Sequence, residues 1–335
     1  MFTLSGVLSY ISGRGRILRS GYLGAHNMSS HPSPGELAQM VKAVIPPLSY
    51  SRHKGQAGRV GVVGGCREYT GAPYYAAISS LRVGGDLATV FCTQAAATAI
   101  KSYNPELIVL PCLDEGNAVS SVTAVLPRLH SLVIGPGLGR DAAVLTTTTR
   151  VIEAAKGRNM PMVIDADGLF LVTDNPSVIN NYTKAILTPN KVEFGRLYEK
   201  VCGGKPNPKN PVVSLKQLCQ QLGNVTIVQK GEMDVISDGK NVLVCDLEGS
   251  PRRCGGQGDL LAGSMGVFNY WAHQAVEADN PNQSLKIYGP TICAAYAACA
   301  LTRQCNRLAF SQHGRSTITT DMIGQIHTAF EALFQ

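Results

Sequence analysis

The chain has 335 residues, of which 44% are hydrophobic and 16% are charged. This length and apolar content suffice for a sizeable core and exclude a protein that is disordered throughout. The longest apolar stretch, residues 291–301, is about half of the roughly 20 residues that a membrane-spanning helix needs, so no membrane association is expected. The net charge is +7, but residues 1–54 carry six basic residues and one acid, which leaves +2 for the rest. No basic stripe interleaved with aromatic residues occurs, so nucleic acid is not expected as a partner.

The first 35 residues contain three arginines, several serines and no acid, with apolar patches between them. This composition is typical of a mitochondrial presequence, and it lacks the uninterrupted apolar region of a secretory signal. Met28 offers an internal start that would give a cytosolic form. The predicted organisation is a presequence or a disordered N-terminus over 1–35 and a single domain over 36–335.

The ten cysteines show neither a paired spacing nor a Cys-x-x-Cys pair. The sequence therefore predicts no disulfide framework, no zinc site and no thioredoxin-like site. Thiols of this kind are usual in a reducing compartment, where they pack as small apolar side chains.

From Arg59 onward, short apolar runs alternate with stretches of helical pattern. Strands are predicted at 61–64, 87–92, 131–134, 162–164, 185–187 and 225–228, and helices at 72–83 and 142–156. Residues 233–245 predict a β-hairpin with an Asp-Gly turn, and helices follow at 260–272, 290–308 and 321–334. Strands that are apolar on both faces and separated by helices predict an α/β domain with a mostly parallel sheet covered on both faces.

In such a sheet, ligands bind at the carboxyl ends of the strands, so polar and Gly-rich residues after each strand are informative. The segment 254–263 (Cys-Gly-Gly-Gln-Gly-Asp-Leu-Leu-Ala-Gly) leads into a helix. Its glycines let successive backbone N–H groups point outward at a helix N-terminus, which favours an anion. Asp259 lies beside them, where a base could serve phosphoryl transfer to a hydroxyl. A turn followed by an ordinary acidic first helical turn is the structural alternative.

The segment 187–196 places Asn190 and Glu193 three residues apart at the start of a short helix. This pair could hold Mg²⁺ through waters beside nucleotide phosphates. The alternative, which the residues alone favour, is an N-cap with an acid three residues later.

Four further segments give weaker indications of a functional site. Residues 134–139 (Ile-Gly-Pro-Gly-Leu-Gly) could approach a ligand closely or form a tight turn. Asp165 and Asp167 at a strand end could orient a metal or cap a helix, and Lys230 after another strand could neutralise a phosphate or stay solvated. His53, before the first strand, more often lies on a surface. No Walker-type loop, no Gly-x-Ser-x-Gly and no His-Glu-x-x-His occurs.

Six motifs occur in a fixed order: His-Lys-Gly-x-x-Gly-x-Val at 53–60, Gly-Pro-Gly-Leu-Gly-Arg at 135–140, Asp-Ala-Asp-Gly-Leu at 165–169, Thr-Pro-Asn-x-x-Glu-Phe at 188–194, Lys-Gly-x-x-Asp at 230–234 and Gly-Gln-Gly-Asp-x-Leu-Ala-Gly at 256–263. In this order they resemble the ribokinase-like superfamily and, within it, the eukaryotic ATP-dependent NAD(P)H-hydrate dehydratases. The resemblance covers the chain from about Leu37 to its C-terminus.

The resemblance implies a metabolite-repair lyase. Such enzymes use ATP, with Mg²⁺, to phosphorylate the 6-hydroxyl of the S form of hydrated NADH or NADPH. The phosphate then leaves, which regenerates the reduced dinucleotide with ADP and phosphate. It also implies functional pairing with an NAD(P)H-hydrate epimerase, and relatives often form homo-oligomers.

The resemblance makes Asp259 the catalytic base and Gly255 to Gly258 the anion hole. It implies that Glu193 lies near Mg²⁺ and, weakly, that His53 belongs to the site. The implied substrate-binding residues are Gly137, Gly139, Asn190, Lys191, Val192, Glu193, Phe194, Gly195, Arg196 and Asp259. The implied ATP-binding residues are Lys230, Gly231, Glu232, Met233, Asp234, Gly249, Ser250, Pro251, Arg252, Arg253, Cys254, Gly255, Gly256, Gln257 and Gly258.

Gln257 departs from the hydroxyl or thiol residue expected in bacterial relatives, which leaves the choice between ATP and ADP open. Two other functions also remain open. One is a ribokinase-like kinase of a vitamin precursor or sugar that releases its phosphorylated product. The other is a Rossmann oxidoreductase or dinucleotide-binding protein, although no Gly-x-Gly-x-x-Gly motif supports it.

Overall fold

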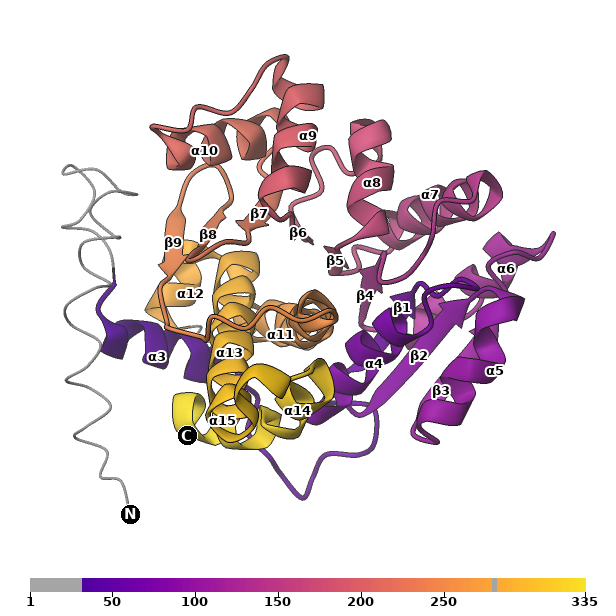
Figure 1. Ribbon diagram of the computed structural model, residues 1–335, viewed down its shortest axis with the longest axis horizontal. Helices are drawn as coiled ribbons and strands as arrows, with labels where there is room; N and C mark the ends of the chain where they lie inside the picture. The colour runs from indigo at the N-terminus through magenta and orange to yellow at the C-terminus, as the bar shows by residue number, and fades with distance from the viewer. Residues whose placement is uncertain (1–31, 279–281) are drawn as a thin grey trace.

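The computed structural model describes residues 32–278 and 282–335. These residues form a sheet with the order β3-β2-β1-β4-β5-β6-β7-β8-β9 (Figure 1). Neighbouring strands from β3 to β7 pair in parallel, whereas β8 is antiparallel to both β7 and β9. The strands are β1 (Arg59–Val63), β2 (Leu87–Cys92), β3 (Leu107–Pro111), β4 (Ser131–Ile134), β5 (Met162–Ile164), β6 (Ala185–Leu187), β7 (Thr226–Gln229), β8 (Asp234–Ser237) and β9 (Val242–Cys245). The predicted mostly parallel sheet and its hairpin are confirmed.

Helices cover both faces of the sheet (Figure 1). The helices of one face are α3 (Pro34–Val44), α4 (Gly71–Val83), α5 (Gln94–Tyr103), α11 (Gln257–Val276), α12 (Gln283–Tyr288), α13 (Pro290–His313), α14 (Thr319–Gly324) and α15 (Ile326–Phe334). The helices of the other face are α6 (Ala118–Thr123), α7 (Ala142–Gly157), α8 (Asp167–Asp174), α9 (Lys191–Cys202) and α10 (Pro211–Gln221).

The two cores arise from alternation along each strand. In β4, Val133 packs into one core while Leu132 and Ile134 pack into the other, and all three are fully buried. Successive side chains of a strand point to opposite faces, so a strand between two helical layers must be apolar throughout.

Two predicted elements need correction, and one strand was missed. The strand predicted at 61–64 is β1, which ends at Val63, because Gly64 turns against the backbone of Pro136. The helix predicted at 321–334 is two helices, α14 and α15, divided after Gly324, and glycine is a poor helix former. Strand β3 was not predicted; it lies at the sheet edge with Ile108 exposed, so it lacks the burial of the central strands.

The ten cysteines are all free thiols, as the spacing predicted. No helix in the described ranges combines the length and the hydropathy needed to cross a bilayer.

Candidate active site

Three polar side chains meet at the carboxyl edge of the sheet. Asp165 follows β5, Thr188 follows β6 and Lys230 follows β7. The Asp165 Oδ1 atom accepts hydrogen bonds from Lys230 Nζ at 2.7 Å and from Thr188 Oγ1 at 2.8 Å. Burial opposes the charge of Lys230, but the neighbouring Asp165 carboxylate outweighs it and raises the pKa of the lysine. Lys230 therefore keeps its positive charge at neutral pH, and that charge lies against the Asp165 carboxylate.

The N-terminus of α11 lies against this pair. Gly256 has a φ of 92°, a conformation that glycine adopts without strain, and it turns the chain into the helix. A Cβ atom placed on Gly258 would lie 3.4 Å from Asp165 Oδ2 and 3.6 Å from Lys230 Nζ. Within the described residues, the backbone N–H groups of 255–259 have no acceptor, as expected at a helix start. Unpaired N–H groups at a helix N-terminus are the geometry on which the prediction of an anion-binding turn rests.

Asp259 lies in the first turn of α11, as predicted. Its carboxyl is partly buried and accepts no hydrogen bond from the described part of the chain. Burial, and secondarily the negative charge of Asp165, raise the pKa of Asp259 to about 7, while Lys230 opposes the shift. A carboxyl with a pKa near neutrality can take and return a proton at physiological pH.

Two glycine loops close one side of the site. A Cβ atom on Gly137 would lie 2.6 Å from the Tyr69 carbonyl oxygen, and the Gly65 N–H donates to the Gly137 carbonyl. The Gly139 N–H donates to Asp167 Oδ2 at 3.0 Å. Close packing of the loops after β1 and β4 thus requires these glycines, and Asp167 braces the second loop.

At the start of α9, the side chains of Asn190 and Glu193 form a helix cap, which was the structural alternative in the sequence analysis. The Asn190 side chain accepts from the N–H groups of Val192 and Glu193, and Glu193 Oε2 accepts from the Asn190 N–H at 2.8 Å. Glu193 nevertheless lies close enough to raise the pKa of Lys230. Phe194 packs in the core with 2% of its surface exposed. The exposed members of the segment 190–196 are Asn190, Lys191, Val192 and Arg196, and Gly195 is partly buried.

The two predicted ATP segments, 230–234 and 249–258, are joined by α13. Arg303 donates to Asp234 Oδ2 at 2.7 Å and to the carbonyl oxygens of Gly231 and Glu232. Asn306 accepts from the Ser250 N–H at 2.6 Å and donates to the Arg252 carbonyl. The sequence analysis missed both residues. Their signal was two polar side chains, three residues apart, in a helix whose preceding turns are apolar.

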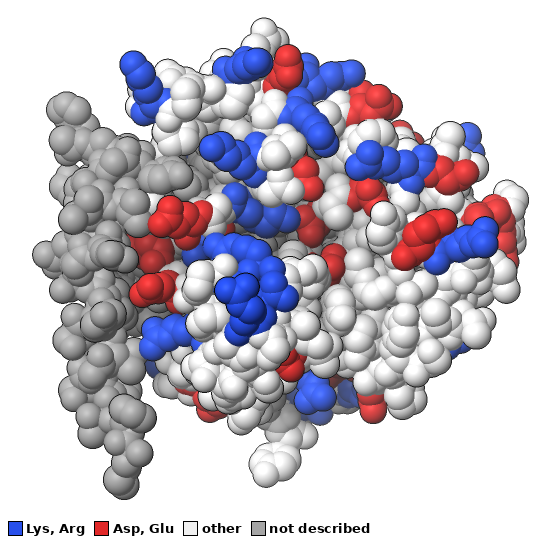
Figure 2. Space-filling model, in the orientation of Figure 1, with Lys and Arg blue, Asp and Glu red and all other residues white. Residues whose placement is uncertain are grey.

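Further hydrogen bonds hold the loop 249–258 in place. Gln257 Nε2 donates to the Arg252 carbonyl at 3.2 Å and lies 3.2 Å from Cys254 Sγ. From α14, Thr319 Oγ1 donates to the Gly255 carbonyl at 2.6 Å, a contact that the sequence did not predict. Met233 is buried, while Pro251 and Arg253 are exposed and Gly249 is partly buried. Figure 2 shows Lys and Arg side chains gathered over α13 and the segment that leads to α11.

His53 does not belong to this site, contrary to the expectation from its motif. It is exposed and precedes β1, so it lies at the amino edge of the sheet, opposite Asp165 and Lys230. The described residues also contain no group of three or more His, Cys, Asp or Glu side chains placed to hold a metal.

Comparisons with known proteins show the family of this chain. Residues 60–328 match the family described as NAD(P)H-hydrate dehydratase. The human ATP-dependent (S)-NAD(P)H-hydrate dehydratase is 57% identical over 297 residues, which cover 89% of this chain and 84% of the human protein. The relative of the same name from Danio rerio is 52% identical over 319 residues, covering 95% and 93% of the two chains.

Solved structures share the fold. A ribokinase-like superfamily protein from Enterococcus faecalis matches with a TM-score of 0.70 at 22% identity, covering 89% of this chain and 95% of that one. The Bacillus subtilis ADP/ATP-dependent NAD(P)H-hydrate dehydratase, co-crystallised with ATP and Mg²⁺, matches with a TM-score of 0.63 at 20% identity, covering 88% and 97%. On its sequence, and with a ribokinase-like fold, the chain belongs to the NAD(P)H-hydrate dehydratase family.

Proposed function

We propose that this chain uses ATP to dehydrate the S form of hydrated NADH and NADPH at the carboxyl edge of its sheet. The observation that carries the mechanism is the Asp259 carboxyl: it is unpaired, its pKa is raised to about 7, and it lies beside the amide groups of the α11 N-terminus. A base and an anion-binding turn side by side are what phosphoryl transfer to a hydroxyl requires.

The reaction has two steps. Asp259 takes the proton of the 6-hydroxyl, whose oxygen attacks the terminal phosphorus of ATP, so that the new P–O bond replaces the bond to ADP. The amide groups of 255–258 hold the charge that spreads over the transferred phosphoryl group. The lone pair of the ring nitrogen then expels phosphate, a much better leaving group than hydroxide, and the adjacent ring carbon loses a proton. The products are NAD(P)H, ADP and phosphate.

Lys230 and Asp165 act as a unit beside the base. Only one of the three Lys230 N–H donors is known to be engaged, by Asp165, so the others can reach a phosphate of ATP. Asp165 also helps to keep the pKa of Asp259 near neutrality. We assign ATP to 230–234 and 249–258, the loops that α13 joins, and the hydrated dinucleotide to Gly137, Gly139 and 190–196.

Mg²⁺ fits this site as an ion held mainly by the triphosphate and by water. Glu193 is the protein group suited to contact it, because only its Oε2 atom is engaged in the helix cap. Magnesium in phosphoryl-transfer sites is commonly bound by one or two carboxylates with substrate phosphates and waters. When bound, it would neutralise charge on the phosphates.

The test uses S-hydrated NADH whose 6-hydroxyl carries the heavy isotope of oxygen. With ATP and Mg²⁺, absorbance of the reduced nicotinamide should return, with one ADP and one phosphate formed for each NADH. Elimination of a phosphorylated intermediate puts the heavy oxygen into phosphate. Heavy oxygen in water would contradict the mechanism, and a stable phosphorylated product would support the small-molecule kinase instead. The R form serves as a matched control that should not react.

Three features of the cellular context belong to the same proposal. Residues 1–35 direct import into mitochondria, and a form that starts at Met28 stays in the cytosol; α3 begins at Pro34, close to the expected boundary. The enzyme acts with an epimerase, which supplies the S form from the R form, and as a homo-oligomer. Imaging of a reporter fused to residues 1–35 tests import into mitochondria. Adding an epimerase to a mixture of R- and S-hydrated NADH tests the pairing, and light scattering measures the oligomeric state.

A further inference from the structure

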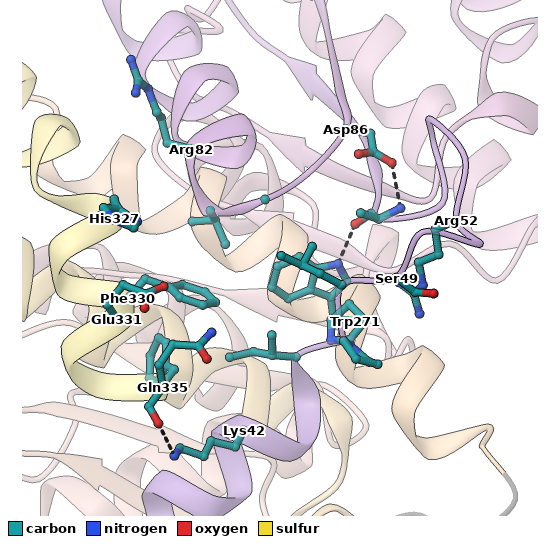
Figure 3. A pocket seen from close by; sticks show the side chains of 18 of the residues that line it. Lys42, Ser49, Arg52, Arg82, Asp86, Trp271, His327, Phe330, Glu331 and Gln335 are labelled. Atoms are coloured by element: carbon teal, nitrogen blue, oxygen red, sulfur yellow. Dashed lines mark hydrogen bonds between the residues drawn. The ribbon is translucent and has the colours of Figure 1, made fainter.

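A cavity of about 750 Å³ lies near the C-terminal half of α11, away from Asp259 at the start of that helix. Figure 3 shows the side chains that line it. The cavity opens between α3, the segment 45–57, the C-terminal end of α4, α11 and α15. Its residue Trp271 is twelve positions after Asp259 on α11, which corresponds to about 18 Å. Small-molecule sites commonly have volumes of roughly 300–1,000 Å³. The cavity is therefore large enough for a ligand and separate from the catalytic site.

The floor of this cavity is apolar and fixed in place. Trp271 is 5% exposed, and its Nε1–H group donates to the Ala57 carbonyl at 2.6 Å. Its ring packs edge-on against Phe268, with centroids 5.6 Å apart. Phe330 and Phe334 of α15 continue the same aromatic surface. A flat apolar group would find this surface already formed, so little ordering would be needed for binding.

The rim of the cavity carries an excess of positive charge. The Lys and Arg side chains that line it are Lys42, Arg52, Lys54 and Arg82, and the acidic side chains are Asp86 and Glu331. Lys42 Nζ donates to an oxygen of Gln335 at 2.7 Å. The Asp86 carboxylate is occupied by the N–H groups of Gly55 and Ala57, at 2.7 and 2.8 Å. Within the described chain, no ion pair joins Arg52 or Lys54 to an acid. Their charges remain available to a ligand.

We propose that this cavity binds a small organic anion, with its flat apolar part against Trp271 and its negative group beside Arg52 and Lys54. An uncharged ligand would leave the two cations without a partner, and a purely inorganic anion would leave the aromatic floor uncovered. The first 31 residues of the chain carry three arginines and no acid, so their charge does not complement the rim. A separate anionic ligand satisfies both the floor and the rim.

The test exploits the fact that Trp271 is the only tryptophan of the chain. The probe is anilinonaphthalene sulfonate, an aromatic anion that accepts energy from excited tryptophan. Titration of the full-length protein should show saturable energy transfer from Trp271, unchanged by saturating ATP and Mg²⁺. The matched control is N-phenylnaphthylamine, which has the same rings without the sulfonate and should bind more weakly.

The double variant Arg52→Gln, Lys54→Gln should weaken binding of the sulfonate by about fivefold and leave binding of the uncharged probe unchanged. Its melting temperature and ATP-dependent turnover should match the unsubstituted protein, because both residues are exposed and lie at the far edge. Arg150→Gln, an exposed arginine on α7, should change neither probe. Four results would each overturn the proposal. They are the absence of energy transfer, displacement of the sulfonate probe by ATP, equal affinity of the two probes, and binding that occurs only when the protein self-associates.

Discussion

Asp234 and Asp259 both carry a carboxylate that is largely removed from solvent, but their negative charges are compensated to different extents. Asp234, at the start of β8, is buried and pairs with Arg303 at 2.7 Å, and it also accepts from the Gly231 N–H. Asp259, at the start of α11, has burial and a negative neighbour but no hydrogen-bond donor among the described residues. The first acid holds a loop in place; the second is left able to take a proton.

The difference lies in how each charge is compensated. Although burial opposes it, pairing with Asp234 raises the pKa of Arg303 further, so Arg303 keeps its positive charge at any physiological pH. Lys230 lies near Asp259 but donates to Asp165 instead, so it lowers the pKa of Asp259 only in part. An incompletely compensated carboxyl costs stability, which is the usual condition of a catalytic base.

The largest effect is expected from Asp259→Asn, which removes the base and keeps the shape of the side chain. Turnover should fall by about 10² to 10⁴-fold, the usual contribution of a general base. Steady-state kinetics with S-hydrated NADH measures this, and Asp174→Asn, an exposed acid on α8, is the matched control. Turnover close to that of the unsubstituted enzyme would remove Asp259 from the mechanism.

The same variant should be more stable than the unsubstituted protein. The folded state holds a proton on Asp259 up to a pH of about 7, whereas the unfolded chain releases it near 4. The penalty therefore grows as the pH rises from 4 to 7 and is complete above 7. Denaturant unfolding should show a gain on the order of 1–2 kcal/mol at pH 8 and little gain at pH 4. A gain that is equal at both pH values would contradict the raised pKa.

Asp234→Asn should show the opposite pattern, with stability lost. It leaves the Arg303 charge buried without its partner, which should lower the free energy of unfolding by about 3 kcal/mol. Arg140→Met, which breaks the exposed pair with Asp167, should cost less than about 1 kcal/mol. If urea unfolding showed the same loss of unfolding free energy for both variants, burial would not account for the expected difference between the two ion pairs.

Lys230→Ala should change ATP use more than maximal rate. The KM for ATP should rise about tenfold, or ~1.4 kcal/mol, while Lys230→Arg keeps the charge and most of the affinity. Loss of the lysine also removes what lowers the pKa of Asp259. In the unsubstituted enzyme kcat/KM should rise with pH through about 7, because the base must be deprotonated. In Lys230→Ala the midpoint of the rise in kcat/KM with pH should move to higher pH. An unchanged midpoint would show that Lys230 does not influence the pKa of Asp259.

Much of the fold and the centre of the site could be predicted from the sequence, because they depend on local signals. Apolar runs reveal central strands, and the glycines before Asp259 reveal a turn at a helix start. What could not be predicted depends on contacts between distant segments. Arg303 meets Asp234 across 69 positions, and Lys230 meets Asp165 across 65. His53 was wrongly included because motif order says nothing about which end of a strand a residue occupies.

The Thr319 hydroxyl of α14 donates a hydrogen bond to the turn at Gly255, and Arg303 and Asn306 of α13 hydrogen-bond to the two loops that we assign to ATP. Every one of these anchors follows the loops it secures. During translation, the catalytic residues leave the ribosome before the segments that lock them. A nascent chain that stopped at residue 290 would contain the base, the lysine and the glycine turn, but it would lack Arg303, Asn306 and Thr319, which hydrogen-bond to the loops around them. Competence for phosphoryl transfer is thus acquired late, when the last helices dock.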